Sequence, residues 1–254
     1  MQTTGPAPAN VGLPDNRIWG TQRARSLNLL VHADRLPDGR LDHDASVAFA
    51  RRAANHVSTL VMYGDGSGNY QNQYEPKWTG VAAAWKRRDE ELYHVVGRRI
   101  KRKMVPDEME THAVNECMST ALVERWRVEE QVIVLTDNII ALQEIRDWVP
   151  GQGGANEAAL QRLKRLDDLF AAQGVPVVVR FLKGRRFVEG HDVADVMARQ
   201  LSCQRKKPKW SGDQRYRERE EYIFWKIKYW FWTMDNSAEL NGTFLVLAIY
   251  MEHG

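Results

Sequence analysis

The chain has almost no cysteine and no long hydrophobic run, and each shortage excludes a class of protein. Its two cysteines, Cys117 and Cys203, are too few for a disulfide framework or a structural zinc site and favour a reducing compartment. The longest apolar stretch, TFLVLAIYM, is far shorter than the roughly 20 residues that span a bilayer. The N-terminus, MQTTGPAPANVGLPDN, lacks the basic start and apolar centre of a signal peptide. We therefore expect an intracellular protein of the nucleus or cytoplasm.

The net charge is also small, and by itself it does not indicate any class of binding partner. Lysine and arginine number 36 against 33 acidic residues, which gives +3, too little alone to indicate nucleic-acid binding. The length of 254 residues and the hydrophobic fraction of 43% suit one globular domain with extensions.

Composition divides the chain into four segments. Residues 1–16 are polar and rich in proline and glycine, and we expect them to be disordered. Residues 17–56 form an N-terminal extension with a turn-rich stretch and one short helix. Residues 57–202 carry the regular patterns of a compact domain, and residues 203–254 form a basic and aromatic C-terminal extension.

The compact domain alternates strand and helix patterns. The expected elements are a strand at 58–65, a hairpin at 79–100, a helix at 106–127, a strand at 131–137, helices at 138–149 and 155–174, a strand at 175–184 and a helix at 190–202. Strands that follow crossover helices should be parallel, whereas the hairpin strands should be antiparallel. The pattern predicts an α/β fold with a mixed sheet flanked by helices.

Four acidic residues lie at the ends of apolar strands or within helix patterns that are otherwise largely apolar. Asp65 and Asp137 end apolar strands, Glu110 lies in the first turns of a helix, and Asp195 lies among apolar residues of the last helix. Singly, the aspartates could be turn or cap residues or solvated, and the glutamate could complement a helix dipole. Together they predict a cluster of like charges that divalent cations would neutralise, since Mg²⁺ and Mn²⁺ prefer carboxylate ligands.

The motifs around these acids resemble those of type 1 ribonuclease H domains, including the reverse-transcriptase and retroelement type. YGDGSG resembles the first-strand motif and contains Asp65, and EMETHAVNECMSTALV resembles the catalytic helix and contains Glu110. VLTDN resembles the motif at the second acidic strand end and contains Asp137, and FLKGRRFVEGHDVADVMAR resembles the last motif, without a gap, and contains Asp195. The resemblance covers residues 57–202.

The resemblance implies a ribonuclease H-like five-stranded mixed sheet with helices on both faces. It further implies an endonuclease that hydrolyses the RNA strand of RNA–DNA hybrids with two Mg²⁺ ions, for which Mn²⁺ can substitute. The four acids would be both the catalytic residues and the metal ligands. Backbone amides near Gly66 and Ser67 would lie beside the scissile phosphate.

Two positions depart from the pattern in ways that bear on catalysis. Arg185 occupies the place of a loop histidine; arginine cannot act as a base but can bind phosphate. His191 replaces an asparagine four residues before Asp195, so both side chains share one helix face. His191 could take over part of the missing histidine's role, or it could be a polar residue at a helix start.

The positions that would read the hybrid also differ. Pro106 and Asp107 stand in place of asparagines, and Asn138 and Ile139 follow the second acidic strand end. We expect Asn138 to contact substrate, with altered preference because contacts to 2′-hydroxyls distinguish RNA from DNA. The short loop DWVPGQGGANE lacks the basic extension of some cellular enzymes.

The C-terminal extension contains a basic cluster, RKKPK, and an aromatic run with Trp225, Trp230 and Trp232. The basic cluster could contact phosphate or be a solvated linker, and the tryptophans could bind a protein partner or pack on the domain. These sequence features are consistent with two functions. The protein is either a metal-dependent nuclease or a nucleic-acid-binding module of retroelement origin with weak or no activity. We expect a monomer.

Overall fold

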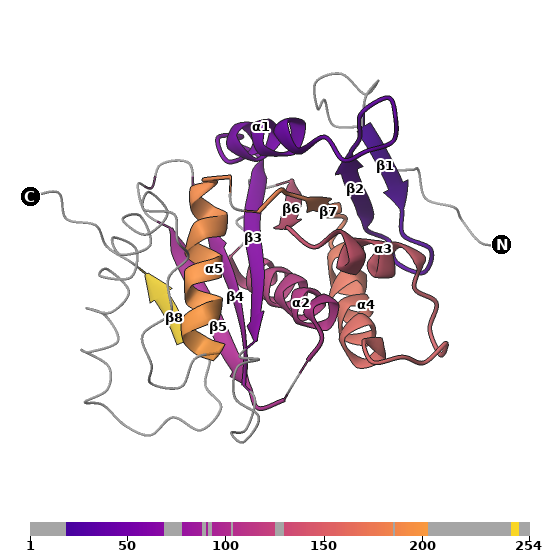
Figure 1. Cartoon of the computed structure of the whole chain (residues 1–254), viewed down its shortest axis with the longest axis vertical. Coiled ribbons are helices and arrows are strands. Elements are labelled where there is room, and N and C mark those ends of the chain that lie inside the picture. Colours follow the sequence, from indigo (N-terminus) through magenta and orange to yellow (C-terminus); the bar gives the residue numbers. More distant parts are fainter. Residues whose placement is uncertain are drawn as a thin grey trace, which may run out of the picture.

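A computed structural model describes residues 19–68, 78–87, 90, 93–102, 104–124, 130–184, 186–202 and 245–248. Eight strands form one sheet in the order β1-β2-β7-β6-β3-β4-β5-β8 (Figure 1). The strands are β1 (Trp19–Arg23), β2 (Leu30–Asp34), β3 (Thr59–Gly68), β4 (Thr79–Trp85), β5 (His94–Ile100), β6 (Gln131–Thr136), β7 (Val177–Phe181) and β8 (Leu245–Ala248). The helices are α1 (His43–Ala53), α2 (Pro106–Glu124), α3 (Ile139–Asp147), α4 (Glu157–Ala172) and α5 (Glu189–Ser202).

The strand directions confirm the expected mixed sheet. Strands β3, β4 and β5 form an antiparallel meander, and β6 and β7 run parallel to β3 after their crossover helices. These five strands and the helices between them have the order and directions that the sequence predicts. The sheet is wider than the predicted five strands, because β1 and β2 extend it beyond β7 and β8 pairs with β5.

Side-chain alternation along the strands divides the core into two layers. In β3, Leu60 and Met62 pack in one hydrophobic cluster with α2, α3 and α4, whereas Val61 and Tyr63 pack in the other with α1 and α5. Successive strand residues point to opposite faces of a sheet, so β3 packs against helices on both faces. The helices therefore cover both faces, as predicted.

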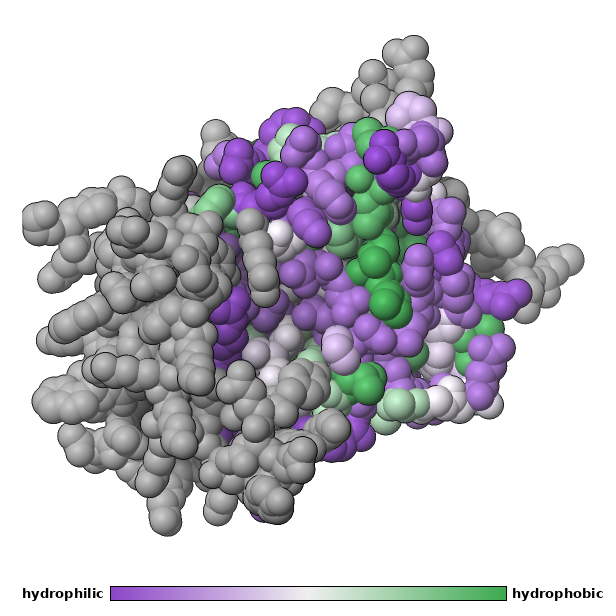
Figure 2. Space-filling model, in the orientation of Figure 1, coloured by the Kyte–Doolittle hydropathy of each residue, from purple (hydrophilic) through white to green (hydrophobic). Residues whose placement is uncertain are grey.

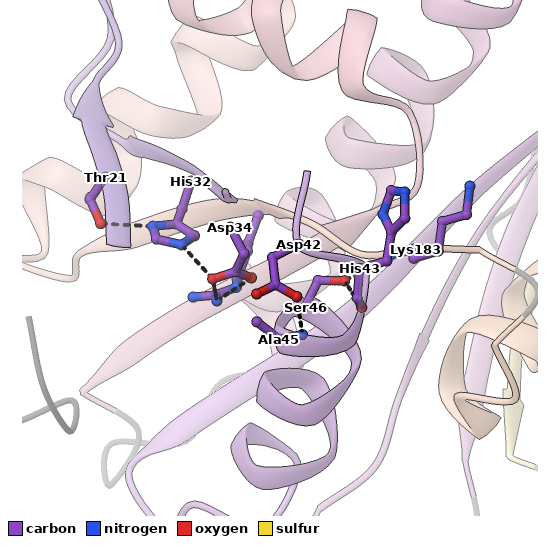
Figure 3. A network of polar contacts seen from close by, with 9 residues as sticks. Thr21, His32, Asp34, Asp42, His43, Ala45, Ser46 and Lys183 are labelled. Carbon is purple, nitrogen blue, oxygen red and sulfur yellow. Dashed lines mark hydrogen bonds and ion pairs between the residues drawn. The ribbon is translucent and has the colours of Figure 1, made fainter. Parts of the chain in front are cut away.

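The N-terminal extension joins the same sheet, which the sequence did not reveal. Asp34 of β2 accepts two hydrogen bonds of 2.7 and 2.6 Å from Arg180 of β7, and both side chains are buried. The Arg180 guanidinium lies 3.5 Å from the ring centroid of Phe49 in α1. Asp34 also contacts His32, whose ring meets Thr21 of β1 (Figure 3). This buried polar network attaches the extension to the domain that begins, by our prediction, near residue 57.

The surface of the described residues is mainly hydrophilic on the face shown in Figure 2, with a narrow strip of hydrophobic residues. Among the described residues, no helix has the length and apolar character needed to cross a bilayer. The predicted disorder of residues 1–16, the basic cluster and the tryptophan run of the C-terminal extension lie outside the described residues, as does Arg185.

Candidate active site

Two aspartates meet where the parallel pairing of β3 with β6 ends. Strand β3 itself does not end at Asp65, as the sequence predicted, but continues to Gly68 because residues 65–68 still pair with β4. Tyr63 of β3 is in register with Leu135 of β6, and Asp65 and Asp137 each lie two residues further along the chain. Residues two apart point to the same side of a strand, so both aspartates lie on the face that α5 covers. Adjacent parallel strands thus deliver two carboxylates to one place.

Glu110 reaches the same edge from α2 and is fixed there by two hydrogen bonds. The Gly66 amide donates to its Oε1 at 3.2 Å, and the Thr136 hydroxyl donates to its Oε2 at 3.0 Å. The helix approaches β3 closely, because a Cβ on Gly66 would lie 2.7 Å from the Met109 carbonyl carbon. A glycine in this strand therefore allows the glutamate to enter the cluster.

Helix α5 supplies the remaining residues. The Nε2 atom of His191 lies 3.9 Å from Oδ1 of Asp65 and 3.7 Å from Oδ2 of Asp137. One ligand atom from each of these three residues lies within 4.8 Å of the others, an arrangement that could hold a metal ion. Asp195, one turn further along α5, is ion-paired with Arg199.

The pKa of Asp65 is affected by its burial and by the charges of the other three predicted acids. Burial raises the pKa of Asp65 well above its ordinary value of 3.8, and the carboxylates of Asp195, Glu110 and Asp137 raise it further. Arg199 lowers it only in part. The other three predicted acids therefore all lie close enough to affect Asp65, even though Asp195 lies outside the tight group of three ligand atoms.

The pKa of Glu110 is raised as well. Burial, followed by the charge of Asp137, raises its pKa from 4.5 to about 8, against the lowering effect of its hydrogen bonds from Gly66 and Thr136. Buried carboxylates that repel one another destabilise a protein unless a cation compensates them. The donor set of carboxylates with one imidazole suits a divalent metal ion, so these residues fit the cofactor that the motifs imply.

The predicted substrate contacts are largely engaged within the protein. The Gly66 amide donates to Glu110, and the Ser67 hydroxyl accepts a hydrogen bond of 3.4 Å from Ser202. The Asn138 side chain caps α3 by accepting from two amides, and it donates to Asp107 at 3.3 Å. Their contact with substrate, like that of Arg185, stays a prediction.

Three residues that the sequence reasoning did not single out help to build the site. Thr136 anchors Glu110, and Arg199 pairs with Asp195. Gly184 follows β7 and leaves room for the second aspartate, since a Cβ there would lie 2.1 Å from Oδ2 of Asp137. Only the arginine had a visible signal, because it stands four residues after Asp195 on one helix face.

Comparison with known proteins gives structural matches alone. The sequence matches no protein-family model, and no curated protein is detectably similar to it. Among solved structures, ribonuclease H1 from Halobacterium salinarum is 16% identical, with 56% of this chain and 96% of that chain covered and a TM-score of 0.39. The N-terminal ribonuclease H domain of a Mycobacterium tuberculosis protein is 15% identical, covers 57% and 94%, and has a TM-score of 0.43. LC11-RNase H1 in complex with an RNA/DNA hybrid is 10% identical, covers 56% and 96%, and has a TM-score of 0.43.

Proposed function

We propose that this protein is a divalent-metal-dependent endonuclease that hydrolyses the RNA strand of RNA–DNA hybrids. The observation that carries the proposal is the convergence of Asp65, Glu110 and Asp137 at one edge of the sheet, within electrostatic reach of Asp195. Four mutually repelling acids have no structural benefit that apolar residues would not provide better. The choice of substrate rests on the four motifs in which these acids occur.

The acids would bind two Mg²⁺ ions, with Mn²⁺ as the substitute, and the ions would supply Lewis acidity for phosphodiester hydrolysis. Asp65 lies within strand β3 and Asp137 directly after strand β6, and side chains held by a sheet suit precise placement of a ligand. Gly66 and Thr136 keep both oxygens of Glu110 oriented toward the cluster. Asp65 and Glu110 are buried, so their carboxylates have little contact with bulk water, and this strengthens the electrostatic interactions that they make.

One observation favours the second candidate function, a nucleic-acid-binding module of retroelement origin with weak or no activity. Arg199 pairs with Asp195 and so competes with a metal ion for that carboxylate. A protein in which this ion pair persisted would bind its ligand without a complete set of acidic ligands.

The two functions separate in a cleavage assay. A hybrid labelled on its RNA strand is incubated with the full-length protein in Mg²⁺ and, separately, in Mn²⁺, beside Asp65→Asn and the exposed control Asp168→Asn. The enzyme proposal expects metal-dependent cutting of the RNA strand that Asp65→Asn abolishes and Asp168→Asn retains. Binding of the hybrid without cutting in either metal would reject the enzyme and support the binding module.

A further inference from the structure

A buried imidazole points into the acid cluster without a hydrogen bond at its inner nitrogen. His191 is only 5% exposed, and its Nε2 atom has no hydrogen-bond partner among the described residues. A buried polar atom that makes no hydrogen bond destabilises a fold, so its retention calls for an explanation. Helix α5 lies across the sheet at β3 and β4 (Figure 1), so the imidazole reaches the acids directly from the covering helix.

The distances around this nitrogen are too long for hydrogen bonds. Its separations of 3.9 Å from Asp65 and 3.7 Å from Asp137 exceed the 2.7–3.2 Å expected if the ring donated a proton to either carboxylate. They lie instead within the range of distances between two atoms that bind the same ion. Two ligand atoms that are each about 2.1 Å from a metal ion are about 3 Å apart if they bind at a right angle to each other. They are about 4 Å apart if they bind on opposite sides of the ion.

We propose that His191 is a direct metal ligand and that the site, as a mixed carboxylate and imidazole site, selects Mn²⁺ over Mg²⁺. The inference rests on the proposed function in one respect, that the acid cluster binds divalent cations. Mg²⁺ prefers oxygen ligands and gives up bound water reluctantly. Mn²⁺ also binds carboxylates, but as a transition-metal ion it exchanges a bound water for an imidazole nitrogen more readily than Mg²⁺ does. The asparagine that the motif would otherwise carry at this position offers an oxygen, so the histidine changes the ligand chemistry of the site.

The nitrogen can be detected without any activity measurement. Mn²⁺ is added to the full-length wild-type protein, and frozen samples are examined by electron spin echo envelope modulation, which reports nitrogen bonded to Mn²⁺. The same spectra are recorded for His191→Asn and for the control His56→Asn. His56 is an exposed histidine just before β3, and Thr59, where that strand begins, is about 20 Å from Asp65.

The expected result is a ¹⁴N modulation in the wild type that His191→Asn removes and His56→Asn keeps. In equilibrium titrations, His191→Asn should weaken Mn²⁺ binding by about tenfold or more, because even outer-shell partners of metal ligands contribute that much affinity. The same variant should change Mg²⁺ binding by less than about threefold. Far-ultraviolet circular dichroism checks that His191→Asn is folded, and His191→Gln takes its place if it is not. A wild-type spectrum without nitrogen modulation overturns the proposal in either case.

The possible failures are distinguishable. Mn²⁺ that binds in an Asp65-dependent manner without nitrogen modulation overturns the role of His191 and leaves the nuclease proposal intact. Modulation that persists in a folded His191→Asn protein, or equal losses of Mn²⁺ and Mg²⁺ affinity, has the same consequence. No Asp65-dependent binding of either ion overturns both proposals.

Discussion

Replacing Glu110 by glutamine should stabilise the metal-free protein at alkaline pH. The pKa of Glu110 is raised from 4.5 to about 8, first by burial and then by the charge of Asp137. The folded protein therefore retains a proton that the unfolded chain releases once the pH exceeds 4.5. Glutamine keeps a neutral side chain of the same size and removes this difference between the two states.

The size of the effect follows from linkage. Within the interval between pH 4.5 and about 8, each pH unit lowers the free energy of unfolding of the wild type by about 1.4 kcal/mol. Integration from pH 5 to pH 8.5 gives a loss of about 4 kcal/mol that Glu110→Gln should not suffer. His32 and His112 act in the opposite direction below pH 6.5, because burial lowers their pKa, so the informative quantity is the difference between variant and wild type.

Urea unfolding followed by tryptophan fluorescence, with chelator present and at half-unit steps from pH 5 to 8.5, measures this difference. The stability of Glu110→Gln relative to wild type should rise steadily across the range and level off above pH 8. The exposed control Glu130→Gln should follow the wild type at every pH. A difference that stays constant with pH, or that falls, would refute the reasoning that Glu110 is protonated in the metal-free fold.

Three further outcomes are expected. Asp34→Ala should cost about 3–5 kcal/mol in urea unfolding because it removes the carboxylate that compensates the buried Arg180 charge. The double variant Asp34→Leu with Arg180→Met should recover most of this loss, and a single-variant cost below about 1 kcal/mol would show that the pair contributes little. Gly80→Ala should lower the free energy of unfolding by about 1–3 kcal/mol and weaken Mn²⁺ binding, because the added Cβ would lie 2.0 Å from the Ala198 carbonyl oxygen and displace α5. Unchanged stability would show that α5 is not packed this closely. Mn²⁺ at about 100 times its dissociation constant should add about 2.7 kcal/mol to wild-type stability and nothing to Asp65→Asn, as thermal unfolding can check; equal stabilisation of both would place the ion elsewhere.

The central sheet could be predicted because its strands are simple. VMYGD and VIVLTD are apolar runs that end in an aspartate, and parallel strands joined by crossover helices end at one edge of the sheet. The convergence of Asp65 and Asp137 thus follows from strand order and side-chain alternation. The proximity of Glu110 was predictable only through motif resemblance, since the bonds from Gly66 and Thr136 join three separate elements.

The N-terminal strands could not be predicted, and the reason is chemical. In β2, LVHAD, the buried side chains include His32 and Asp34, so the segment lacks the apolar alternation that marks a strand. Their burial is made favourable by Arg180, which lies 146 residues away from Asp34 in the sequence. A local pattern cannot reveal a polar residue whose compensating charge is supplied by a distant strand. Strand β8 was missed for a different reason, because its short apolar run LVLA pairs with β5, which lies far away in the sequence.

Anomalous diffraction from crystals grown with Mn²⁺ would show whether the four acids are gathered to bind divalent cations. An anomalous peak is expected between the carboxylates of Asp65 and Asp137 and the Nε2 atom of His191. The peak should be absent from Asp65→Asn crystals grown in the same way. Wild-type crystals with no peak between these residues, or with peaks only at surface carboxylates, would contradict this role of the acids.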